Sequence, residues 1–234
     1  MVMDDSVYII MPVKDSIETA EQAIHAVVAG GYRLTVYDDY SNAQSAKQLD
    51  SIARQTGIEV IHLNEYTNHP SPNYRWVLID AQRKCLETNR HLVIIESDVT
   101  IDTDTIDLMK SRVLSGIGLV ASATKDDNGR INFPYEYARK IQTDGVCKKR
   151  LSFCCTLLTQ EFMRAYNFEQ LDSDKNWYDV HISHVSREMG FTNILLVSHP
   201  VLHKPHSSRP WKQLKYTNPL LYYWRKLTQG LDKI

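Results

Sequence analysis

Acidic residues stand directly after two short apolar runs of the sequence, where their carboxylates could bind a nucleotide or a metal ion. Asp38 and Asp39 follow one run, and the triplet Glu96-Ser97-Asp98 follows another. Such carboxylates accept hydrogen bonds from a base or a ribose, or they hold a divalent cation that neutralises a diphosphate. The alternatives are a solvated helix-capping turn at the first pair and a helix N-cap at the triplet. The glycine-rich phosphate loop of dinucleotide folds and P-loops does not follow the first apolar run, which favours a nucleotide-sugar as the ligand.

A third acidic residue, Asp179, follows two aromatic residues in the second half of the chain. Trp177 and Tyr178 are of the kind that stacks on sugar rings, and a carboxylate near such rings can have a raised pKa and act as a general base. The alternative is that Asp179 caps a helix that begins there, with both aromatic side chains in the core. We favour the catalytic interpretation.

Three histidines, His199, His203 and His206, lie in a basic segment near the end of the chain. Pro200 and Pro205 interrupt any regular helix there, so a helical His-x-x-x-His zinc site is disfavoured. A loop of solvated histidines is one interpretation of this segment.

The elements that must position these residues alternate along the first hundred residues. Apolar runs at 7–13, 34–37, 58–63 and 91–95 predict strands, and helical spacing predicts the helices 15–29, 43–56 and 74–88 between them. Asp15 and Glu18 have the spacing of a capping box for the first helix. This alternation predicts a mostly parallel, twisted α/β sheet flanked by helices, with ligands bound beyond the carboxyl ends of its strands.

The second half has a less regular pattern. We expect strands at 118–123, 151–158 and 192–197, a turn at 126–129 and a helix at 177–189. The end of the chain, 218–234, reads as a basic and aromatic helix. It is expected to pack on the preceding domain, 1–217, with a membrane interface or a dimer contact as alternatives.

Four short motifs in the right order resemble family 2 glycosyltransferases. The opening strand, Ile9 to Asp15, is similar to the family strand that ends Pro-Val-Tyr-Asn, and Asp38-Asp39-Tyr40-Ser41 resembles its Asp-Asp-Gly-Ser turn. Arg75, with Asp80 and Ala81 further on, resembles its Arg-x-x-x-Asn-x-Gly/Ala segment. Glu96-Ser97-Asp98 stands where the family carries its Asp-x-Asp motif. The resemblance covers roughly residues 7–109 well and the second half loosely; Tyr40 and Glu96 depart from the pattern.

The resemblance implies a single domain of the GT-A type and a set of site residues. The residues implied to bind the nucleotide are Pro12, Val13, Asp38, Asp39, Arg75 and Ser97. A divalent cation, Mn²⁺ or Mg²⁺, is implied at Asp98 and His203, with Glu96 and His206 as the reserve ligands. Asp179 corresponds to the catalytic base, and Trp177 and Tyr178 are expected to contact the acceptor sugar.

The resemblance therefore implies an inverting, metal-dependent glycosyltransferase in polysaccharide or lipopolysaccharide assembly. A UDP-sugar is the favoured donor, and a glycan or lipid-linked glycan is the expected acceptor. Rival interpretations are a non-catalytic sugar-nucleotide-binding or assembly subunit and a sugar nucleotidyltransferase. The nucleotidyltransferase is disfavoured because it needs a glycine-rich loop after the first strand.

Composition sets outer limits on function and location. The chain has 234 residues, of which 43% are hydrophobic and 24% are charged, with a formal net charge of −1. That balance argues against bulk binding of nucleic acid. Its four cysteines form no CxxC pair and indicate a reducing compartment, and Cys154 and Cys155, adjacent in an apolar run, are expected as buried core thiols. We expect a cytoplasmic protein. Peripheral contact at the inner membrane face is the alternative, because residues 201–234 carry seven Lys or Arg and one acidic residue.

Overall fold

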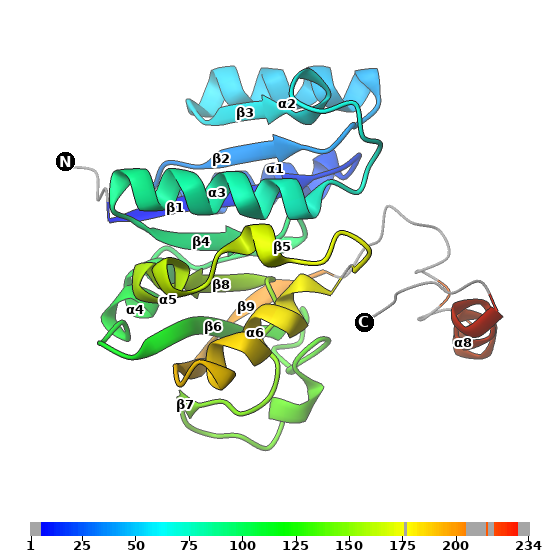
Figure 1. Cartoon of the computed structure of the whole chain (residues 1–234). Coiled ribbons are helices and arrows are strands. Elements are labelled where there is room, and N and C mark those ends of the chain that lie inside the picture. Colours follow the sequence, from blue (N-terminus) through cyan, green and yellow to red (C-terminus); the bar gives the residue numbers. More distant parts are fainter. Residues whose placement is uncertain (1–5, 176, 205–213, 215–217, 229–234) are drawn as a thin grey trace.

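The computed structural model describes residues 6–175, 177–204, 214 and 218–228. Nine strands of this part of the chain form one sheet in the order β3-β2-β1-β4-β8-β6-β9-β5, with β7 paired to β9 (Figure 1). The strands are β1 (Val7–Val13), β2 (Thr35–Asp38), β3 (Glu59–His62), β4 (His91–Ile95), β5 (Val99–Thr100), β6 (Ile117–Lys125), β7 (Gly145–Val146), β8 (Cys155–Leu158) and β9 (Thr192–His203). The helices are α1 (Ile17–Ala29), α2 (Ala43–Thr56), α3 (Tyr74–Thr88), α4 (Thr105–Ser111), α5 (Gln160–Ala165), α6 (Tyr178–Glu188) and α8 (Pro219–Thr228), with 3₁₀ turns η1 (Leu63–Glu65), η2 (Glu136–Ala138) and η3 (Phe168–Gln170).

The first four strands confirm the predicted parallel arrangement. β1 pairs in parallel with β2 and with β4, and β2 pairs in parallel with β3. The register places Val13 opposite Asp38, so the ends of β1 and β2 lie side by side. The carboxyl ends of these strands therefore form one edge, as the βαβ alternation requires.

The helix ends in this half follow from local side-chain chemistry. Asn42 caps α2 by accepting from the backbone N–H groups of Gln44 and Ser45, and Gly57 ends the helix in the left-handed conformation that glycine favours. The capping box predicted for α1 is wrong. Asp15 lies outside the helix with φ 56°, Ser16 is the N-cap, and the carboxylate of Asp15 accepts from Asn42 instead.

The second half mixes strand directions. β8 is antiparallel to both of its neighbours, β4 and β6, whereas β6 and β9 are parallel. The strand expected at 151–158 begins only at Cys155, because Leu151 and Ser152 direct their backbone N–H groups to the hydroxyls of Ser183 and Tyr135. The turn expected at 126–129 is confirmed by a hydrogen bond from Gly129 N to Asp126 O.

Strand β9 is longer than its sequence indicates. We expected it to end at Val197, but it continues to His203 and pairs there with β5. Pro200 lies in the interruption between Leu196 and Val201, where the pairing with β6 shifts register. Proline lacks a backbone N–H and is tolerated at such irregularities. The continuation of this strand carries His203 to the functional edge.

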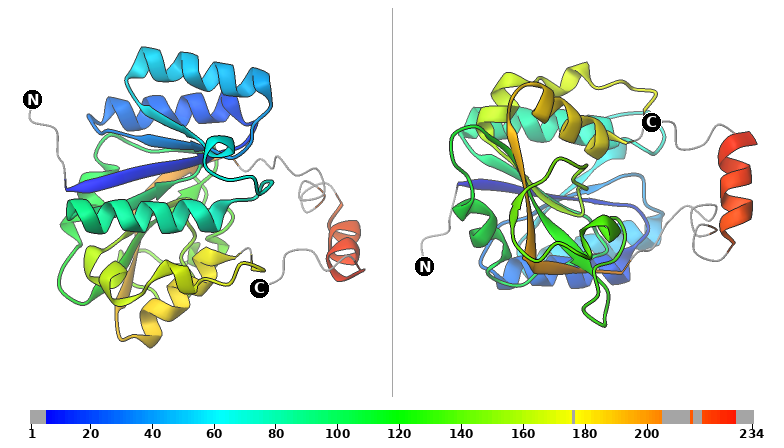
Figure 2. Two further views of the ribbon diagram at one scale, coloured as in Figure 1. Left: turned by 45° about the horizontal axis from the view of Figure 1, so that its top comes forward. Right: turned by 90° about the horizontal axis from the view of Figure 1, so that it is seen from below.

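Helices cover both faces of the sheet, as Figure 2 shows in two views, and an apolar layer lies between the helices and each face. Alternate residues of each strand enter opposite layers, so that Ile10 packs on one side while Ile9 and Met11 pack on the other. Helices α3, α5 and α6 supply buried side chains to the first layer, and α1, α2 and α4 supply them to the second. The sheet is thus held rigidly from both faces.

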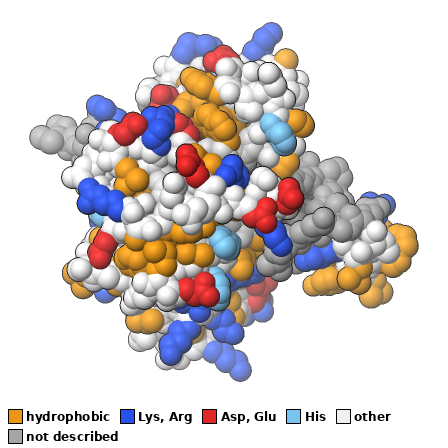
Figure 3. Space-filling view, in the orientation of Figure 1, with side chains coloured by type: hydrophobic (Ala, Val, Ile, Leu, Met, Phe, Trp, Pro, Cys, Tyr) orange, Lys and Arg blue, Asp and Glu red, His pale blue; other side chains and the backbone are white. Residues whose placement is uncertain are grey.

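Helix α8 stands beside the sheet rather than within either layer (Figures 1 and 2). Apolar side chains gather on its surface with basic side chains at their margins (Figure 3). Leu220 is 85% exposed and Leu227 is 83% exposed, whereas Tyr222 is buried. The Nζ atom of Lys226 lies 5.6 Å from the centre of the Trp177 ring, so the helix contacts the loop before α6. None of the described helices is long and apolar enough to cross a bilayer.

Candidate metal and nucleotide site

The end of β4 and the start of β8 bring Glu96 and Cys154 together. Because these strands are antiparallel with Ile95 opposite Cys155, the residue after one strand meets the residue before the other. The Glu96 backbone N–H donates to the Cys154 carbonyl over 3.0 Å. The Cys154 thiol donates to Glu96 Oε2 over 3.3 Å.

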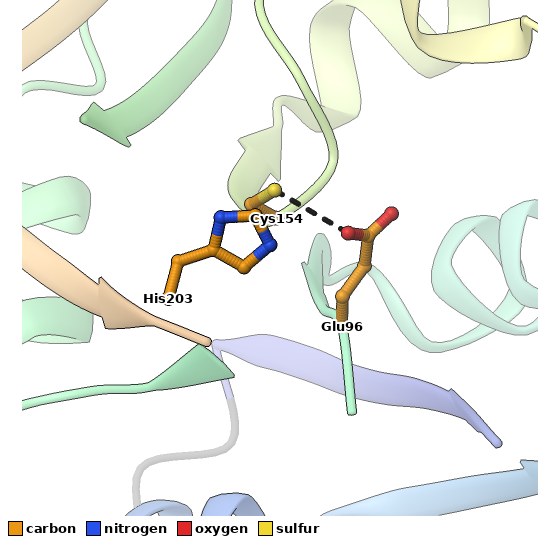
Figure 4. Close-up of side chains that lie close together, drawn as sticks. All are labelled: Glu96, Cys154 and His203. Carbon is orange, nitrogen blue, oxygen red and sulfur yellow. Dashed lines mark hydrogen bonds between the residues drawn. The ribbon is translucent and has the colours of Figure 1, made fainter. Parts of the chain in front are cut away.

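His203 joins this pair from the end of β9. Figure 4 shows the three side chains converging from separate strands. One ligand atom from each of Glu96, Cys154 and His203 lies within 4.8 Å of the others, a grouping that could hold a metal ion. Oxygen, nitrogen and sulfur are all donors that borderline divalent metals accept, while the carboxylate also suits harder ions such as Mn²⁺.

The predicted metal ligands Asp98 and His203 are also close together. The pairing of β5 with β9 places Val99 opposite His203, and Asp98 Oδ2 lies 3.5 Å from His203 Nε2. His203 Nδ1 lies 2.7 Å from the carbonyl of Phe133, which can accept only if Nδ1 carries the proton. This second bond fixes the ring and leaves Nε2 to face the acidic groups, as is usual for metal-binding histidines.

The acidic groups of this corner repel one another in the absence of a cation. Burial, together with the charge of Asp98, raises the pKa of Glu96 to about 7. Burial alone would lower the pKa of His203, but the hydrogen bond and charge of Asp98 and the charge of Glu96 hold it above its ordinary value. A divalent cation would relieve this repulsion, so the residues present fit the metal that the sequence predicts.

Asp179 lies in the first turn of α6, close enough to Glu96 for its charge to raise the pKa of Glu96 further. Burial raises the pKa of Asp179 itself. Opposing effects come from hydrogen bonds donated by the Val180 backbone and the Ser152 hydroxyl, and from the charge of Arg150. The N-cap of α6 is Trp177, so Asp179 does not occupy the capping position that was its alternative role. A half-buried carboxyl with a raised pKa is suited to accept a proton.

The two aromatic residues before Asp179 have different surroundings. Tyr178 is buried, and its hydroxyl donates to the carbonyl of Asp172, which leaves little of its ring to stack on a sugar. Trp177 is half-buried, with cationic groups of Arg150 and Lys226 beside its ring. Of the two predicted acceptor contacts, Trp177 has the accessible surface.

The predicted nucleotide residues at the ends of β1 and β2 are already hydrogen-bonded within the protein. Asp38 accepts from the Ser41 backbone N–H and lies 2.7 Å from His62 Nδ1. The Asp39 carboxylate accepts from the Ser71 hydroxyl and from both the backbone and the side chain of Asn73. These bonds fix the turn after β2 and the loop before α3.

The remaining nucleotide residues are distributed along the same edge. The backbone N–H of Asp39 donates to the carbonyl of Val13, which follows Pro12 in β1, and Ser97 is 9% exposed between the two acidic residues of its triplet. The guanidinium of Arg75 donates to the carbonyls of Glu169 and Leu171. Contacts of all six residues with a nucleotide stay predictions.

Tyr40 departs from the glycine of the family turn, yet it adopts the backbone conformation that glycine favours. Its φ is 61°, in the left-handed region that costs other residues roughly 1–2 kcal/mol. Lys14 donates to the Tyr40 carbonyl, and the Tyr40 hydroxyl donates to the carbonyl of Thr67. These contacts hold the turn in its strained form.

Sequence reasoning missed three side chains near this corner. Cys154 was expected only as a core thiol, like Cys155, whose sulfur contacts Met109 in the core. Tyr74 and Arg150 were not singled out. The charges of Glu96 and Asp179 raise the pKa of the Tyr74 hydroxyl, and the charge of Arg150 lowers the pKa of Asp179. Only the antiparallel pairing of β4 with β8, which the sequence did not reveal, could have pointed to Cys154. His206, the reserve metal ligand, lies outside the described residues.

Solved structures decide which fold this arrangement represents. The mannosyltransferase PcManGT from Pyrobaculum calidifontis, in complex with GDP-Man and Mn²⁺, is similar with a TM-score of 0.62 and 13% identity over 95% of this chain and 64% of that one. S. aureus TarS 1-349 in complex with UDP is similar with a TM-score of 0.61 and 12% identity over 95% and 66% of the two chains. The chain has the GT-A fold.

A third GT-A structure extends the likeness. Glucosyl-3-phosphoglycerate synthase from Mycobacterium tuberculosis, in complex with Mn²⁺, UDP and glucosyl-3-phosphoglycerate, has a TM-score of 0.55 and 14% identity over 97% of this chain and 81% of that one. This chain spans about two thirds or less of the length of PcManGT and TarS. No family model and no curated protein matches the sequence. The GT-A fold therefore rests on structure.

Proposed function

We propose that this GT-A domain transfers a sugar from a nucleoside-diphosphate sugar to an acceptor hydroxyl. The observation that carries the proposal is the corner of Glu96, Asp98 and His203 beyond β4, with the half-buried Asp179 beside it. The loop after β4, the end of β9 and the first turn of α6 bring these groups together although their carboxylates repel one another. That arrangement is suited to a bound cation on one side and to proton transfer on the other.

The residues of the corner would divide the reaction between them. Asp98 and His203, with Glu96, would hold Mn²⁺ or Mg²⁺, which when bound stabilises negative charge on the departing diphosphate. Asp179 would take the proton from the acceptor hydroxyl, whose oxygen then bonds to the anomeric carbon. The bond from that carbon to the β-phosphate oxygen breaks, and the nucleoside diphosphate leaves with the electron pair. Attack from the face opposite the diphosphate makes this an inverting transfer.

The donor would lie along the edge formed by β1, β2 and β4. Neighbouring solved structures hold GDP-Man or UDP together with Mn²⁺, and a UDP-sugar is our favoured donor here. Polysaccharide or lipopolysaccharide assembly is the setting that the family resemblance supports. A glycan or lipid-linked glycan is the corresponding acceptor.

Thermal unfolding tests the donor site. The midpoint is measured with UDP, GDP, CMP and TDP, each with and without Mn²⁺, for the wild type, Asp98→Ala and the control Glu21→Ala, which removes an exposed carboxylate from α1. Ligands that bind the native state raise the midpoint by mass action. We expect one nucleoside diphosphate to stabilise the wild type and the control only with Mn²⁺, and this shift to vanish in Asp98→Ala. No shift with any nucleotide at saturating concentration would overturn the donor site.

A further inference from the structure

The guanidinium of Arg150 lies close to two aromatic rings near the candidate site. Its Cζ atom is 5.5 Å from the centre of the Trp177 ring and 6.0 Å from that of Phe133. The side chain is half-buried, and among the described residues its guanidinium takes part in no hydrogen bond or ion pair. Its backbone carbonyl accepts from the Tyr137 hydroxyl. Five N–H donors are therefore available to a ligand.

The surroundings place this cation between the metal corner and the proposed base. The carbonyl of Phe133 lies 2.7 Å from Nδ1 of the metal-corner histidine, His203, and the charge of Arg150 acts on Asp179. A second cation, Lys226 of α8, lies 5.6 Å from the centre of the same Trp177 ring. Two positive charges thus flank the aromatic surface on which an acceptor would rest.

A second unsatisfied donor is the hydroxyl of Tyr74. It is buried and has no hydrogen-bond partner within the described part of the chain. The charges of Glu96 and Asp179 both act on it, so it lies near the proposed reacting groups. A buried hydroxyl without a partner is costly, and a polar ligand that accepts from it would remove that cost.

We infer that Arg150 binds an anionic group of the acceptor, a phosphate or a carboxylate close to the hydroxyl that Asp179 deprotonates. The inference rests on the proposed function. The planar guanidinium offers paired N–H groups to two oxygens of such an anion, and Lys226 adds a second charge. The Tyr74 hydroxyl donates to another acceptor oxygen. A neutral acceptor would leave the charge of Arg150 unused.

The donor diphosphate is the rival ligand for this arginine. A cation bound at Asp98 and His203 would already neutralise the diphosphate, whereas Arg150 lies 5.5 Å from the centre of the Trp177 ring and its charge acts on Asp179. We therefore assign Arg150 to the acceptor rather than to the donor. The experiment must separate these two anions.

Calorimetry on the full chain loaded with UDP and Mn²⁺ can do so, with glycerol 3-phosphate and glycerol as probes. We expect the wild type to bind glycerol 3-phosphate and to bind glycerol far more weakly. Arg150→Met should weaken the phosphate probe about tenfold or more, because a charge-assisted bidentate contact is lost, and Arg150→Lys should fall between the two. Lys149→Met removes a neighbouring charge that lies over the Tyr137 ring instead, and it should bind as the wild type does.

Three results would overturn the inference. Equal binding of the two probes by the wild type would show that charge is not recognised. Unchanged binding of glycerol 3-phosphate by Arg150→Met would place the anion elsewhere. Weaker binding of UDP with Mn²⁺ by Arg150→Met, with folding confirmed by an unchanged unfolding midpoint, would assign the arginine to the donor. Failure of the proposed function has a different signature, since UDP with Mn²⁺ would then not bind the wild type.

Discussion

The two halves of the functional edge differ in how well their polar groups are satisfied. At the ends of β1 and β2, the carboxylates of Asp38 and Asp39 are each bonded to neighbouring backbone or side-chain groups. At the ends of β4 and β9, Glu96 has a pKa raised to about 7 by burial and by the charge of Asp98, and the Tyr74 hydroxyl lacks a partner among the described residues.

This contrast separates a preformed scaffold from a site that needs a ligand. A satisfied network holds its geometry whether or not a ligand is bound, so changes there should act mainly on stability. Unsatisfied or repelling groups gain most from a cation or a substrate, so changes there should act mainly on binding and rate. The following predictions test that division.

Replacing Asp179 with asparagine should have the largest effect. Asparagine keeps the shape but cannot accept the proton, so turnover should fall about 10²- to 10⁴-fold. UDP release from the sugar nucleotide, with water as the acceptor, measures it. Asp174→Asn changes an exposed residue of the same loop and should leave the rate unchanged. Turnover of Asp179→Asn within about twofold of the wild type would exclude Asp179 as the base.

The affinity for Mn²⁺ should depend on pH through Glu96. Its carboxylate binds metal only when deprotonated, and burial and Asp98 raise its pKa to about 7, so affinity should fall as the pH drops below that value. One coupled proton weakens binding about tenfold for each pH unit below the pKa. Calorimetric titration of Mn²⁺ into the protein without nucleotide at pH 6, 7 and 8 measures this.

Glu96→Gln supplies the matched control for that titration. It should bind Mn²⁺ more weakly at pH 8 because it lacks the negative charge, and it should keep only the part of the pH dependence that comes from deprotonation of His203. A wild type with constant affinity over this range would show that Glu96 stays out of the metal site.

His62→Gln should reduce stability in the scaffold half. Burial lowers the pKa of His62, but hydrogen bonds to Asp38 and Asp50 outweigh it and raise the pKa above the ordinary value. A raised folded-state pKa contributes stability that is complete below the unfolded pKa and is lost as the pH rises through the folded one.

Urea unfolding at pH 6 and pH 9 tests this sign. The wild type should exceed His62→Gln by about 1 kcal/mol at pH 6 and by less at pH 9. His25→Gln, which changes an exposed histidine of α1, should show little difference at either pH. A stability difference that grows toward pH 9 would contradict the assignment of a charged His62.

Cys154→Ser should have the smallest effect on Mn²⁺. Manganese prefers oxygen and nitrogen ligands, so its affinity should change by about twofold or less, whereas Cd²⁺ should lose affinity with the thiol. Ultraviolet absorption from a thiolate–Cd²⁺ bond in the wild type, absent from Cys154→Ser, checks the assignment. Cys155→Ser, one residue further into the core, should keep that absorption, and its loss there would contradict the geometry of the corner.

The same two halves differ in what their sequence reveals. In the first half, strand and helix alternate within short stretches, so the ends of β1, β2 and β4 could be placed at one edge from periodicity alone. The family resemblance predicted that Asp98 and His203 share one metal site, and in the structure Asp98 Oδ2 lies 3.5 Å from His203 Nε2.

The second half depends on pairings between distant segments. Cys154 lies next to Glu96 only because β8 runs antiparallel to β4. The direction of a strand and its pairing partner cannot be predicted from a short apolar run of sequence. The length of β9 was missed because Pro200 breaks the strand pattern, although the pairing with β6 resumes at Val201. The Arg150 guanidinium and the Tyr74 hydroxyl stand out because they have no hydrogen-bond partner among the described residues. Only the folded structure shows this.

Tyr40 has a consequence for which positions of the loop can vary. Its hydroxyl donates to the backbone carbonyl of Thr67, an atom that every residue type possesses. Within the described residues the Thr67 side chain makes no hydrogen bond to Tyr40, and its hydroxyl accepts from the backbone N–H of His69. Position 40, in contrast, must supply a ring and a hydroxyl from a left-handed backbone. Substitutions should therefore be tolerated at position 67 and disfavoured at position 40.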